Sequence, residues 1–589
     1  MKLSRLADAV ADLLVEAPDG DPVISSIHYR AQDMREGGIF VAIPGNSADG
    51  HDFIELAVQK GAAAVVSEKP VGVSVPRLRV SKTRTALARM SACFYDNPSE
   101  KMCLVGVTGT NGKTTTSYLI EGIFMAAGFN TGVIGTINYR YGNMNFDNPV
   151  TTPESLDLQR ILAEMVKAGV THAVMEVSSH GVDLGRIEGC AFDVGVFTNL
   201  SQDHLDYHKT MEAYWDCKKR FFAEYLVKGP KAGKAVAVVN TETQKGKELA
   251  RKLAIPVLTV GPEATNGVWP EMIQLNLKGI SGGLWIKGAR IELESVMVGR
   301  HNLENILCAA GVGAALKLPL ECIGRGICAT TRVPGRLEAV SNTGGWSVFV
   351  DYAHSPDALE KVLRTLKSLT GGKVICVFGA GGNRDRGKRP QMGEISGKLA
   401  DFTIITSDNP RSEAPGQIVR EVATGIEPLR KCYPAKDISL DYPGDGYCLE
   451  PDREKGIRLG LKLAQPGDAV LIAGKGHETY QVMGPVTIPF DDRKAVAKAA
   501  AYLAGPQAKD AFWTPSRIAE ATGGTILSNF EGEPVARVVI DSRTLQPDSV
   551  FVAIVGERHD GHGFIEEVVE KGARMVVARE DRIDDLPVE

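Results

Sequence analysis

A glycine-rich segment between an apolar run and an amphipathic stretch could hold a phosphate chain. The segment reads LVGVTGTNGKTTTSYLI, with the turn at residues 109–112. In such a loop, backbone N–H groups and a helix N-terminus face the phosphates, Lys113 supplies a cation, and the hydroxyl of Thr114 or Thr115 can ligate Mg²⁺. Val107 stands where the strict G-x-x-x-x-G-K-T form has its first glycine. A glycine-rich turn with a surface lysine is the alternative, and the flanking strand and helix patterns favour nucleotide binding.

Carboxylate, imidazole and amine groups follow in three further motifs. MEVSSHG places Glu176 after an apolar run, and FTNLSQDHLDYH places Asp203 and His204 after the next one. Open α/β sheets bind ligands at the carboxyl ends of their strands, and Mg²⁺ prefers carboxylate oxygens, so Glu176 is the better candidate ligand and His204 the softer one. YWDCKKRFF adds Lys218 and Lys219, for which periodicity alone predicts a solvated helix face.

Short β-branched runs alternate with amphipathic stretches around these motifs. This pattern is typical of βαβ units built on a mostly parallel sheet. Glycine and proline in RVPGR (332–336) indicate a boundary, and residues 504–514 resemble a linker. The predicted strands are Cys103–Val107, Ala173–Val177, Val194–Phe197, Ala235–Val239, Val348–Asp351, Val374–Phe378, Phe402–Thr406 and Ala469–Ala473.

One small α/β module occurs twice. Residues 40–66 align without a gap on residues 551–577, with 17 identities in 27 positions. Each copy contains a strand-like FVAI, a turn ending in Asp-Gly-His, an amphipathic helix and a second strand, at Ala64–Ser67 and Met575–Ala578. The copies lie too far apart for a solenoid, so the chain between them must contain complete domains.

Composition and charge exclude several classes of protein. With 589 residues, 43% of them hydrophobic and 24% charged, the chain is long enough for roughly three to five globular domains. The net charge of −5 divides into −7 for residues 511–589 and +2 for the rest, so neither part has the basic excess of a nucleic-acid-binding surface. The ten cysteines form no C-x-x-C pair, which indicates reduced thiols. Acidic residues interrupt the apolar N-terminal runs, so we expect a cytoplasmic protein without membrane insertion.

The motifs together resemble the Mur ligases, the ATP-dependent amino-acid ligases that build bacterial cell-wall peptides. The resemblance rests on motifs that match in order over residues 1 to about 500. It implies an α/β fold of three domains: a uridine-binding module (1–100), a central phosphate-loop domain with a mostly parallel sheet (101–335) and a Rossmann-like domain (336–503). The matching motifs are TGTNGKTT, TTP, MEVSSHG, FTNLSQDHLDYH, GRHNLEN, VPGR, DYAHSPDAL and GAGGNRDRGKRP.

The resemblance also implies a role for individual residues. Lys113 and Thr114 would hold ATP phosphates and one Mg²⁺, while Glu176, His204 and a carbamylated Lys218, formed with CO₂, would hold a second. Only a neutral amine captures CO₂, and burial favours that form. The implied ATP set is Gly109, Thr110, Asn111, Gly112, Lys113, Thr114, Thr115, His301, Asn302, Arg336, Asp351 and His354. The implied UDP-N-acetylmuramoyl-dipeptide set is Ser26, Arg30, Thr151, Thr152, Ser178 and Arg186.

Within the family the chain resembles the MurE type, which adds a third amino acid to UDP-N-acetylmuramoyl-L-alanyl-D-glutamate through an acyl phosphate. DNPR (408–411) looks like the signature of members that select meso-diaminopimelate. A planar guanidinium can hold the distal carboxylate of that substrate, which lysine lacks, while Glu478 can hold the distal ammonium. The implied diaminopimelate set is Arg384, Asp408, Asn409, Arg411, Gly474 and Glu478.

The second copy of the module, within residues 512–589, carries Asp541-Ser542-Arg543, the form usual in this family. At the N-terminus we read the corresponding stretch as His28-Tyr29-Arg30. The last copy resembles the N-terminal module of a MurF-type ligase. We expect the leading part of a fusion with such a ligase, rather than a truncated gene product with a spare module.

Other functions compete with this interpretation. A folylpolyglutamate-synthetase-like enzyme would not explain the uridine module, and a lysine-adding ligase would not explain Arg411. A catalytically silent UDP-sugar-peptide-binding scaffold is the candidate from another class. Such a scaffold is expected to have lost Lys113, Glu176 or Lys218, and all three are present.

Overall fold

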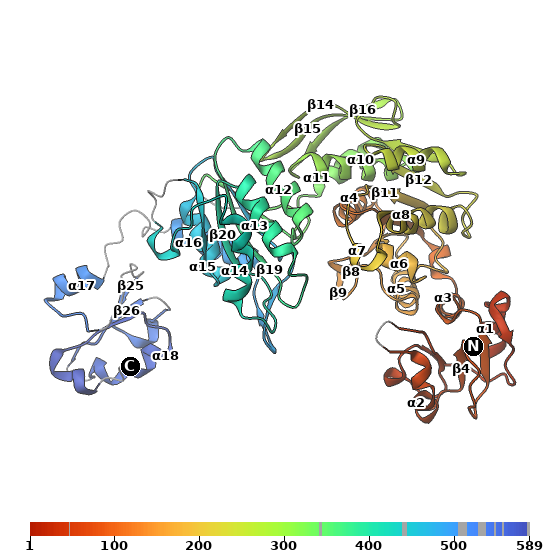
Figure 1. The fold of residues 1–589 in the computed structure, drawn as a ribbon, viewed down its shortest axis with the longest axis horizontal. Coiled ribbons are helices and arrows are strands. Elements are labelled where there is room, and N and C mark those ends of the chain that lie inside the picture. The colour runs from red at the N-terminus through yellow and green to blue at the C-terminus, as the bar shows by residue number, and fades with distance from the viewer. Residues whose placement is uncertain are drawn as a thin grey trace. The chain divides into compact units, whose positions relative to one another are not determined.

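A computed structural model gives the fold of the chain (Figure 1). It describes residues 1–589 except 46–47, 341–343, 439–443, 505–514, 528–536, 547–548, 557–558 and 586–589. The expected linker therefore lies outside the described residues, apart from Ala504. Two compact units are present. The first comprises Met1–Ala339, Phe349–Gly371 and Ala473–Glu478, and the second comprises the rest.

A five-stranded sheet forms the N-terminal module. Its order is β1-β5-β4-β3-β2, with all neighbours parallel except β1 and β5. Strand β3 has alternating side chains on two apolar clusters, because Ile39 and Val41 pack in one and Phe40 in the other. The strands are β1 (Leu14–Glu16), β2 (Ile27–His28), β3 (Ile39–Val41), β4 (Ala64–Ser67) and β5 (Arg77–Val80), with helices α1 (Leu3–Asp8), α2 (Ile54–Gln59) and α3 (Thr83–Phe94).

An eleven-stranded sheet occupies the middle of the chain, in the order β16-β15-β14-β13-β12-β11-β6-β10-β7-β8-β9. The strands from β14 to β7 in this order pair in parallel, and antiparallel hairpins extend both edges. The strands are β6 (Cys103–Thr108), β7 (Thr131–Ile134), β8 (Asn138–Tyr141), β9 (Met144–Asp147), β10 (His172–Glu176), β11 (Val194–Phe197), β12 (Val236–Asn240), β13 (Val257–Val260), β14 (Val268–Asn276), β15 (Gly279–Ile286) and β16 (Ala289–Ser295).

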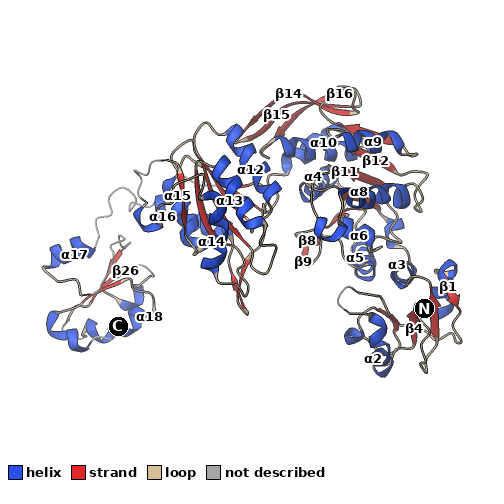
Figure 2. Cartoon of the chain, viewed as in Figure 1, coloured by secondary structure: helices blue, strands red, loops and turns tan. Residues whose placement is uncertain are grey.

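Helices cover both faces of this sheet (Figure 2). Val105 and Val107 of β6 pack in the cluster that contains α4, α10 and α11, while Leu104 packs in the cluster that contains α5, α9 and η5. The sheet is therefore the middle layer of three, as a buried, mostly parallel sheet requires. The helices are α4 (Lys113–Ala126), α5 (Ser155–Lys167), α6 (Ser179–Asp183), α7 (Leu205–His208), α8 (Met211–Arg220), η5 (Phe221–Leu226), α9 (Gln244–Lys252), α10 (Arg300–Ala315) and α11 (Leu320–Ala329).

A six-stranded sheet follows, in the order β17-β18-β22-β19-β20-β21. Strands β19, β20 and β21 run parallel, and Ala380 pairs with Ser407 where β19 and β20 end. The strands are β17 (Glu338–Val340), β18 (Ser347–Asp351), β19 (Val374–Ala380), β20 (Phe402–Ser407), β21 (Gly446–Leu449) and β22 (Ala469–Ala473). The other elements are hairpin β23 (Tyr480–Met483) with β24 (Val486–Pro489), and helices α12 (Pro356–Leu369), α13 (Lys388–Leu399), α14 (Pro415–Ile426), α15 (Arg453–Leu463) and α16 (Asp492–Ala504).

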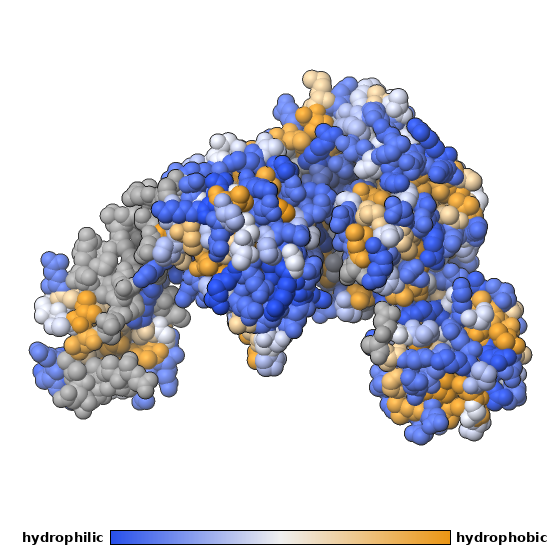
Figure 3. Space-filling view, in the orientation of Figure 1, coloured by the Kyte–Doolittle hydropathy of each residue, from blue (hydrophilic) through white to orange (hydrophobic). Residues whose placement is uncertain are grey.

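The last module repeats part of the first with three parallel strands, β25-β26-β27. Its described elements are α17 (Pro515–Thr522), β25 (Arg537–Val539), β26 (Ser549–Val552), α18 (Ile565–Glu570) and β27 (Met575–Val577). All eight strands predicted for the middle of the chain are present within two residues of their expected ends. In the described part of the chain, no helix is long and apolar enough to cross a membrane. The visible face mixes hydrophobic and hydrophilic residues (Figure 3).

Candidate active site

The glycine-rich loop joins β6 to α4, as its sequence predicts. Gly112 has a φ of 86°, and a Cβ atom there would lie 2.1 Å from Asn305 Oδ1, so only glycine fits. Lys113 is the first residue of α4, and its Nζ donates to the carbonyl oxygens of Gly109 at 3.0 Å and Thr110 at 2.9 Å. Desolvation lowers the pKa of Lys113. The loop thus encloses a lysine ammonium at a helix N-terminus, which suits a phosphate chain.

Residues after β11 hold this loop in place. Asn199 accepts the Asn111 N–H at its Oδ1 (3.0 Å) and the Thr110 N–H at its carbonyl oxygen (2.9 Å). Thr198 Oγ1 donates to the carbonyl oxygen of Asn111 at 2.7 Å. Sequence reasoning assigned no role to Thr198 or Asn199, although both lie in the FTNLSQDHLDYH motif. The available signal was their place directly after the predicted strand Val194–Phe197, which the structure pairs with β6.

Glu176 ends β10 with its carboxylate buried. The residue is 1% exposed, and its two oxygens accept from the backbone N–H and the hydroxyl of Thr136, each at 2.9 Å. Its charge raises the pKa of Lys113, against the larger effect of desolvation. The carboxylate and the loop lysine therefore share one electrostatic environment at the carboxyl edge of the sheet.

Lys218 and Lys219 lie side by side on α8 but in different surroundings. Lys219 has a 43% exposed side chain paired with Asp216, as a solvated face requires. Lys218 is 1% exposed, and its Nζ lies 4.4 Å from the centre of the Tyr214 ring. Desolvation, followed by repulsion from Lys113, lowers the pKa of Lys218 well below its usual value. The solvated face that periodicity alone predicts is therefore wrong for Lys218, which the family resemblance had already set apart from Lys219, because the packing of α8 turns that side chain inward.

His204 lies in a left-handed turn before α7, with a φ of 52° and a 44% exposed side chain. Its Nε2 is 3.4 Å from Asp203 Oδ2. Desolvation lowers its pKa against the opposing charge of Asp203, and the charges of His180, Lys113 and Lys218 lower it as well. The imidazole is therefore biased toward its neutral form, the form that binds metals.

Four residues of the implied dipeptide set form one network beside Glu176. Thr152 Oγ1 donates to the Glu176 carbonyl oxygen at 2.9 Å and accepts from the Ser178 N–H at 3.0 Å. Arg186 Nη1 donates to the Thr152 carbonyl oxygen at 2.9 Å. Thr151 Oγ1 is 3.1 Å from the hydroxyl of Thr136, the residue that also holds the Glu176 carboxylate. These side chains thus surround the strand end that carries the carboxylate.

The implied adenine residues lie at the start of α10. Asn302 is 3% exposed, donates to the Val298 carbonyl oxygen at 2.9 Å and accepts from Asn305 Nδ2 at 3.1 Å. Asn305 also accepts from the hydroxyl of Thr116 in α4 at 3.3 Å, although it was not among the predicted residues. Desolvation lowers the pKa of His301 to about 4. Buried amides thus tie the start of α10 to the phosphate-loop helix.

Arg336, Asp351 and His354 differ in what they contact. Arg336 Nη2 donates to Thr114 Oγ1 at 3.4 Å, which brings the guanidinium to the phosphate loop. Asp351 accepts the backbone N–H groups of Leu337 (2.6 Å) and Ala353 (2.8 Å), so it fixes the segment that carries Arg336. His354 is exposed, with Nδ1 2.8 Å from the carbonyl oxygen of Tyr352.

The implied diaminopimelate residues divide between the two compact units. Arg384, Asp408, Asn409 and Arg411 belong to the second unit, whereas Gly474 and Glu478 belong to the first. Asn409 Oδ1 accepts the Val482 N–H at 2.9 Å, and Asp408 Oδ1 accepts the Asn409 N–H at 2.6 Å. Glu478 accepts from the buried Lys475 Nζ at 3.1 Å, and Gly474 has a φ of 114°.

The N-terminal module corrects one assignment. The repeat pairs Arg30 with Asp541, and each of these residues precedes a 3₁₀ turn, with φ and ψ of −118° and 119° in one copy and −115° and 115° in the other. The stretch at the Asp-Ser-Arg position is therefore Arg30-Ala31-Gln32, and the reading as His28-Tyr29-Arg30 was wrong by two residues. The two stretches differ at every position, but the matching 3₁₀ turns show that they occupy the same position in the two copies. Arg30 is exposed, and Ser26 Oγ lies 2.8 Å from His28 Nε2.

Three family models match the chain. The Mur ligase middle domain matches residues 107–313, and the Mur ligase glutamate ligase domain matches residues 335–476. The catalytic domain of the Mur ligase family matches two segments, 23–95 and 534–585. The last match covers both copies of the repeated module.

Known proteins show the same likeness. The chain is 45% identical over 479 residues to the UDP-N-acetylmuramoyl-L-alanyl-D-glutamate–2,6-diaminopimelate ligase of Geobacter metallireducens, covering 81% of this chain and 94% of that protein. The ligase of the same name from Geobacillus kaustophilus is 42% identical over 481 residues, covering 82% and 95%. A solved structure of a protein with that name has a TM-score of 0.60 and 31% identity, covering 81% and 95%. With a phosphate loop, a buried strand-end carboxylate and these relatives, the chain has the three-domain Mur ligase fold and belongs to the Mur ligase family.

Proposed function

We propose that the chain is an ATP-dependent ligase that adds meso-diaminopimelate to the D-glutamate of UDP-N-acetylmuramoyl-L-alanyl-D-glutamate, in peptidoglycan precursor biosynthesis. The observation that carries this proposal is the 45% identity to a relative with that printed activity, over 94% of the relative's length. The burial of Glu176 and Lys218 beside the phosphate loop supports it, because a scaffold protein has no need of two buried ionisable groups there.

Two displacements make up the proposed reaction. An oxygen of the D-glutamate γ-carboxylate attacks the γ-phosphorus of ATP, so ADP leaves and an acyl phosphate forms. The neutral amine of diaminopimelate then attacks the acyl carbon, phosphate leaves, and the amine loses a proton as the amide forms. Lys113 and the N-terminus of α4 would stabilise the charge on the transferred phosphoryl group, since positioning and electrostatics dominate such transfers.

The residues fit a magnesium site only with a modified lysine. Among the described residues, no group of three His, Cys, Asp or Glu side chains could hold a metal ion. We propose that Lys218 is carbamylated: its buried amine with a lowered pKa is the form that captures CO₂, and the product supplies carboxylate oxygens beside Glu176 and His204. Mg²⁺ bound there, and by Thr114, would neutralise phosphate charge.

The choice of amino acid tests the proposal most directly. Phosphate release would be measured with ATP, the UDP-dipeptide and either meso-diaminopimelate or lysine. We expect diaminopimelate to support release and lysine to be at least about 100-fold poorer in kcat/KM, because lysine leaves the guanidinium of Arg411 without its carboxylate. Faster release with lysine would overturn the substrate assignment, and no release with either would overturn the activity.

Three further assignments remain proposals. They are the expected domain boundaries, a cytoplasmic location, and a fused or adjacent MurF-type ligase as a partner. The family model that matches residues 534–585 also matches residues 23–95, so this match does not distinguish members of the family.

A further inference from the structure

One arginine of the second unit is buried between acidic partners. Arg389, in α13, has a 0% exposed side chain. Its Nη1 donates to Glu413 Oε2 at 2.9 Å and to Glu421 Oε2 at 2.5 Å, and its Nη2 donates to Glu413 Oε1 at 3.0 Å and to the Gly381 carbonyl oxygen at 3.0 Å. Arg386 Nη2 adds a bond to Glu413 at 2.9 Å. We call Arg386, Arg389, Glu413 and Glu421 the Arg389 cluster.

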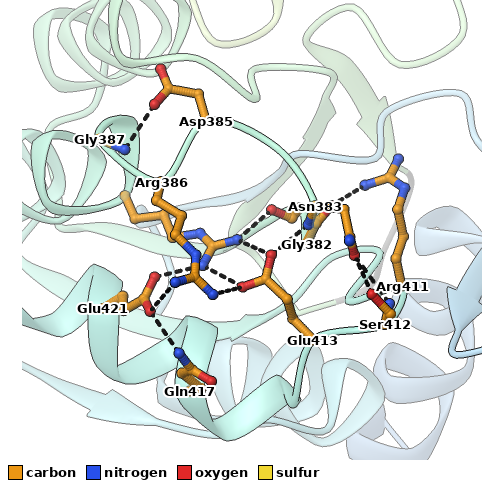
Figure 4. A network of polar contacts seen from close by, with 12 residues as sticks. Gly382, Asn383, Asp385, Arg386, Gly387, Arg411, Ser412, Glu413, Gln417 and Glu421 are labelled. Carbon is orange, nitrogen blue, oxygen red and sulfur yellow. Dashed lines mark hydrogen bonds and ion pairs between the residues drawn. The ribbon is translucent and has the colours of Figure 1, made fainter.

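The cluster joins the two loops that follow β19 and β20. The first loop, residues 381–387, carries Arg384, and the second, residues 408–413, carries Arg411. Glu413 accepts the Asn383 N–H at 2.5 Å, and so links the cluster to the backbone of the first loop (Figure 4). Because β19 and β20 pair in parallel and end together, both loops leave the same edge of the sheet.

Two further contacts hold the loops at a fixed separation. Asn383 Oδ1 accepts from the hydroxyl of Ser412 at 2.8 Å, and Arg411 Nη1 donates to the Gly382 carbonyl oxygen at 2.8 Å. A Cβ atom on Gly382 would lie 1.8 Å from the Pro410 carbonyl oxygen, so the loops are in close backbone contact. In the described part of the chain, Nε and Nη2 of Arg411 make no hydrogen bond or ion pair, which leaves one side of this guanidinium for a ligand.

We propose that Arg389 and Glu413 are positioning residues that set the specificity for the amino-acid substrate by fixing Arg384 and Arg411 relative to each other. The inference rests on the proposed function, in which these two arginines bind diaminopimelate. Neither Arg389 nor Glu413 would touch the substrate. They act through the loops, since a carboxylate held between two guanidinium groups requires both at defined positions.

Two substitutions test this role in the full-length chain. Arg389→Lys keeps the charge but cannot bond to Glu413, Glu421 and Gly381 together. Glu413→Gln keeps the shape and removes the charge. We expect each to raise KM for meso-diaminopimelate by about tenfold or more, with KM for ATP and for the UDP-dipeptide within twofold of wild type. The preference for diaminopimelate over lysine in kcat/KM should fall by a similar factor, because lysine does not use the carboxylate subsite.

A merely structural role predicts a different pattern. In that case KM for all three substrates would change together, or only the thermal midpoint would fall, and either result would overturn the inference. Lys398→Ala is the matched control, because this exposed residue of α13 pairs only with Glu394 among the described residues and should change nothing. If wild type itself fails to use diaminopimelate, the proposed function fails instead of the positioning role.

A milder variant covers the case in which Arg389→Lys does not fold. Ser412→Ala removes one exposed hydroxyl from Asn383 and leaves the Arg389 cluster intact. We expect KM for diaminopimelate to rise about two- to threefold, with the other two KM values unchanged. No change in KM in a folded Ser412→Ala variant, together with unchanged values in Glu413→Gln, would overturn the inference.

Discussion

The two copies of the repeated module share their turn but differ at the residues before it. In the first copy, His51 Nδ1 bonds to Asp49 at 2.6 Å and Nε2 accepts the Glu68 N–H at 3.0 Å. In the second copy, His562 makes the same contacts, with Asp560 at 2.7 Å and the Arg579 N–H at 3.0 Å. The shared Asp-Gly-His motif is therefore a structural device that joins a turn to the end of a strand.

The difference lies at the 3₁₀ turn. Asp541 in the second copy pairs with the Arg543 guanidinium at 2.9 and 2.7 Å, whereas the first copy has Arg30 and Gln32 in these positions. A backbone contact nevertheless recurs, because Lys60 donates to the Gln32 carbonyl oxygen and Lys571 to that of Ser542, one position earlier. The same turn therefore forms whether Asp541 or the oppositely charged Arg30 precedes it.

The largest expected effect comes from removing the lysine of the phosphate loop. Lys113→Ala should lower kcat for ligation by about 100- to 1,000-fold, because the cation that stabilises the transferred phosphoryl group is lost. Steady-state phosphate release measures this loss, and Lys219→Ala, on the exposed side of α8, is the control. Near-normal turnover in Lys113→Ala would contradict the assignment and would imply that the site lies elsewhere.

Replacing the histidine of the Asp-Gly-His motif in each copy should show which copy of the module takes part in substrate binding. His51→Ala removes the acceptor of the part-buried Glu68 N–H, so the first module should lose about 1–3 kcal/mol of local stability. His562→Ala removes the acceptor of the exposed Arg579 N–H, so the last module should lose less, because water can replace that bond. Hydrogen exchange of the peptides that contain Glu68 and Arg579 measures both losses. Only His51→Ala should also raise KM for the UDP-dipeptide, and an equal rise in His562→Ala would show that the terminal module takes part in catalysis.

Charge at the 3₁₀ turn offers a smaller test. Arg30→Ala should raise KM for the UDP-dipeptide by about two- to tenfold if this exposed guanidinium meets the substrate, since a charged hydrogen bond contributes about 1.5 kcal/mol or more. Isothermal titration with the UDP-dipeptide checks the same quantity without turnover. Arg5→Ala, in α1 of the same module, provides a matched control; unchanged affinity in Arg30→Ala would exclude a ligand role.

The smallest effect concerns acid stability of the terminal module. The hydrogen bond from Arg543 lowers the pKa of Asp541 to about 2, from 3.8. A carboxyl with a lowered pKa in the folded state stabilises it above pH 3.8, and this contribution is lost as pH falls through about 2. Asp541→Asn should therefore unfold with a flatter pH dependence between pH 4 and 2, as measured by hydrogen exchange of residues 537–546. An identical profile in wild type and variant would show that the pair contributes nothing.

Local sequence patterns predicted much of the sheet and the phosphate loop. Val194–Phe197 and Ala469–Ala473 were predicted with the bounds that the structure has, because short β-branched runs between turn residues indicate buried parallel strands. The loop before Lys113 was equally clear. Its glycine requirement is local, since Gly112 has a positive φ.

Other features required contacts between distant residues. The antiparallel hairpins at the edges of the central sheet, β8–β9 and β14–β16, were not predicted, because half-exposed strands lack the continuous apolar runs of buried ones. The Arg389 cluster was missed for a related reason: its charged residues resemble a solvated surface until their partners are known.

The sequence by itself determined the family, the phosphate loop and the repeated module, because each rests on contiguous motifs that can be recognised without knowing which residues they contact. Only the tertiary structure decided how Lys218 comes to be buried beside an exposed Lys219, and that Arg389 has its acidic partners 24 and 32 residues away. The physical reason is that an ionisable group takes its chemistry from desolvation and from neighbouring charges. Both depend on packing, which adjacent residues of the same type do not share.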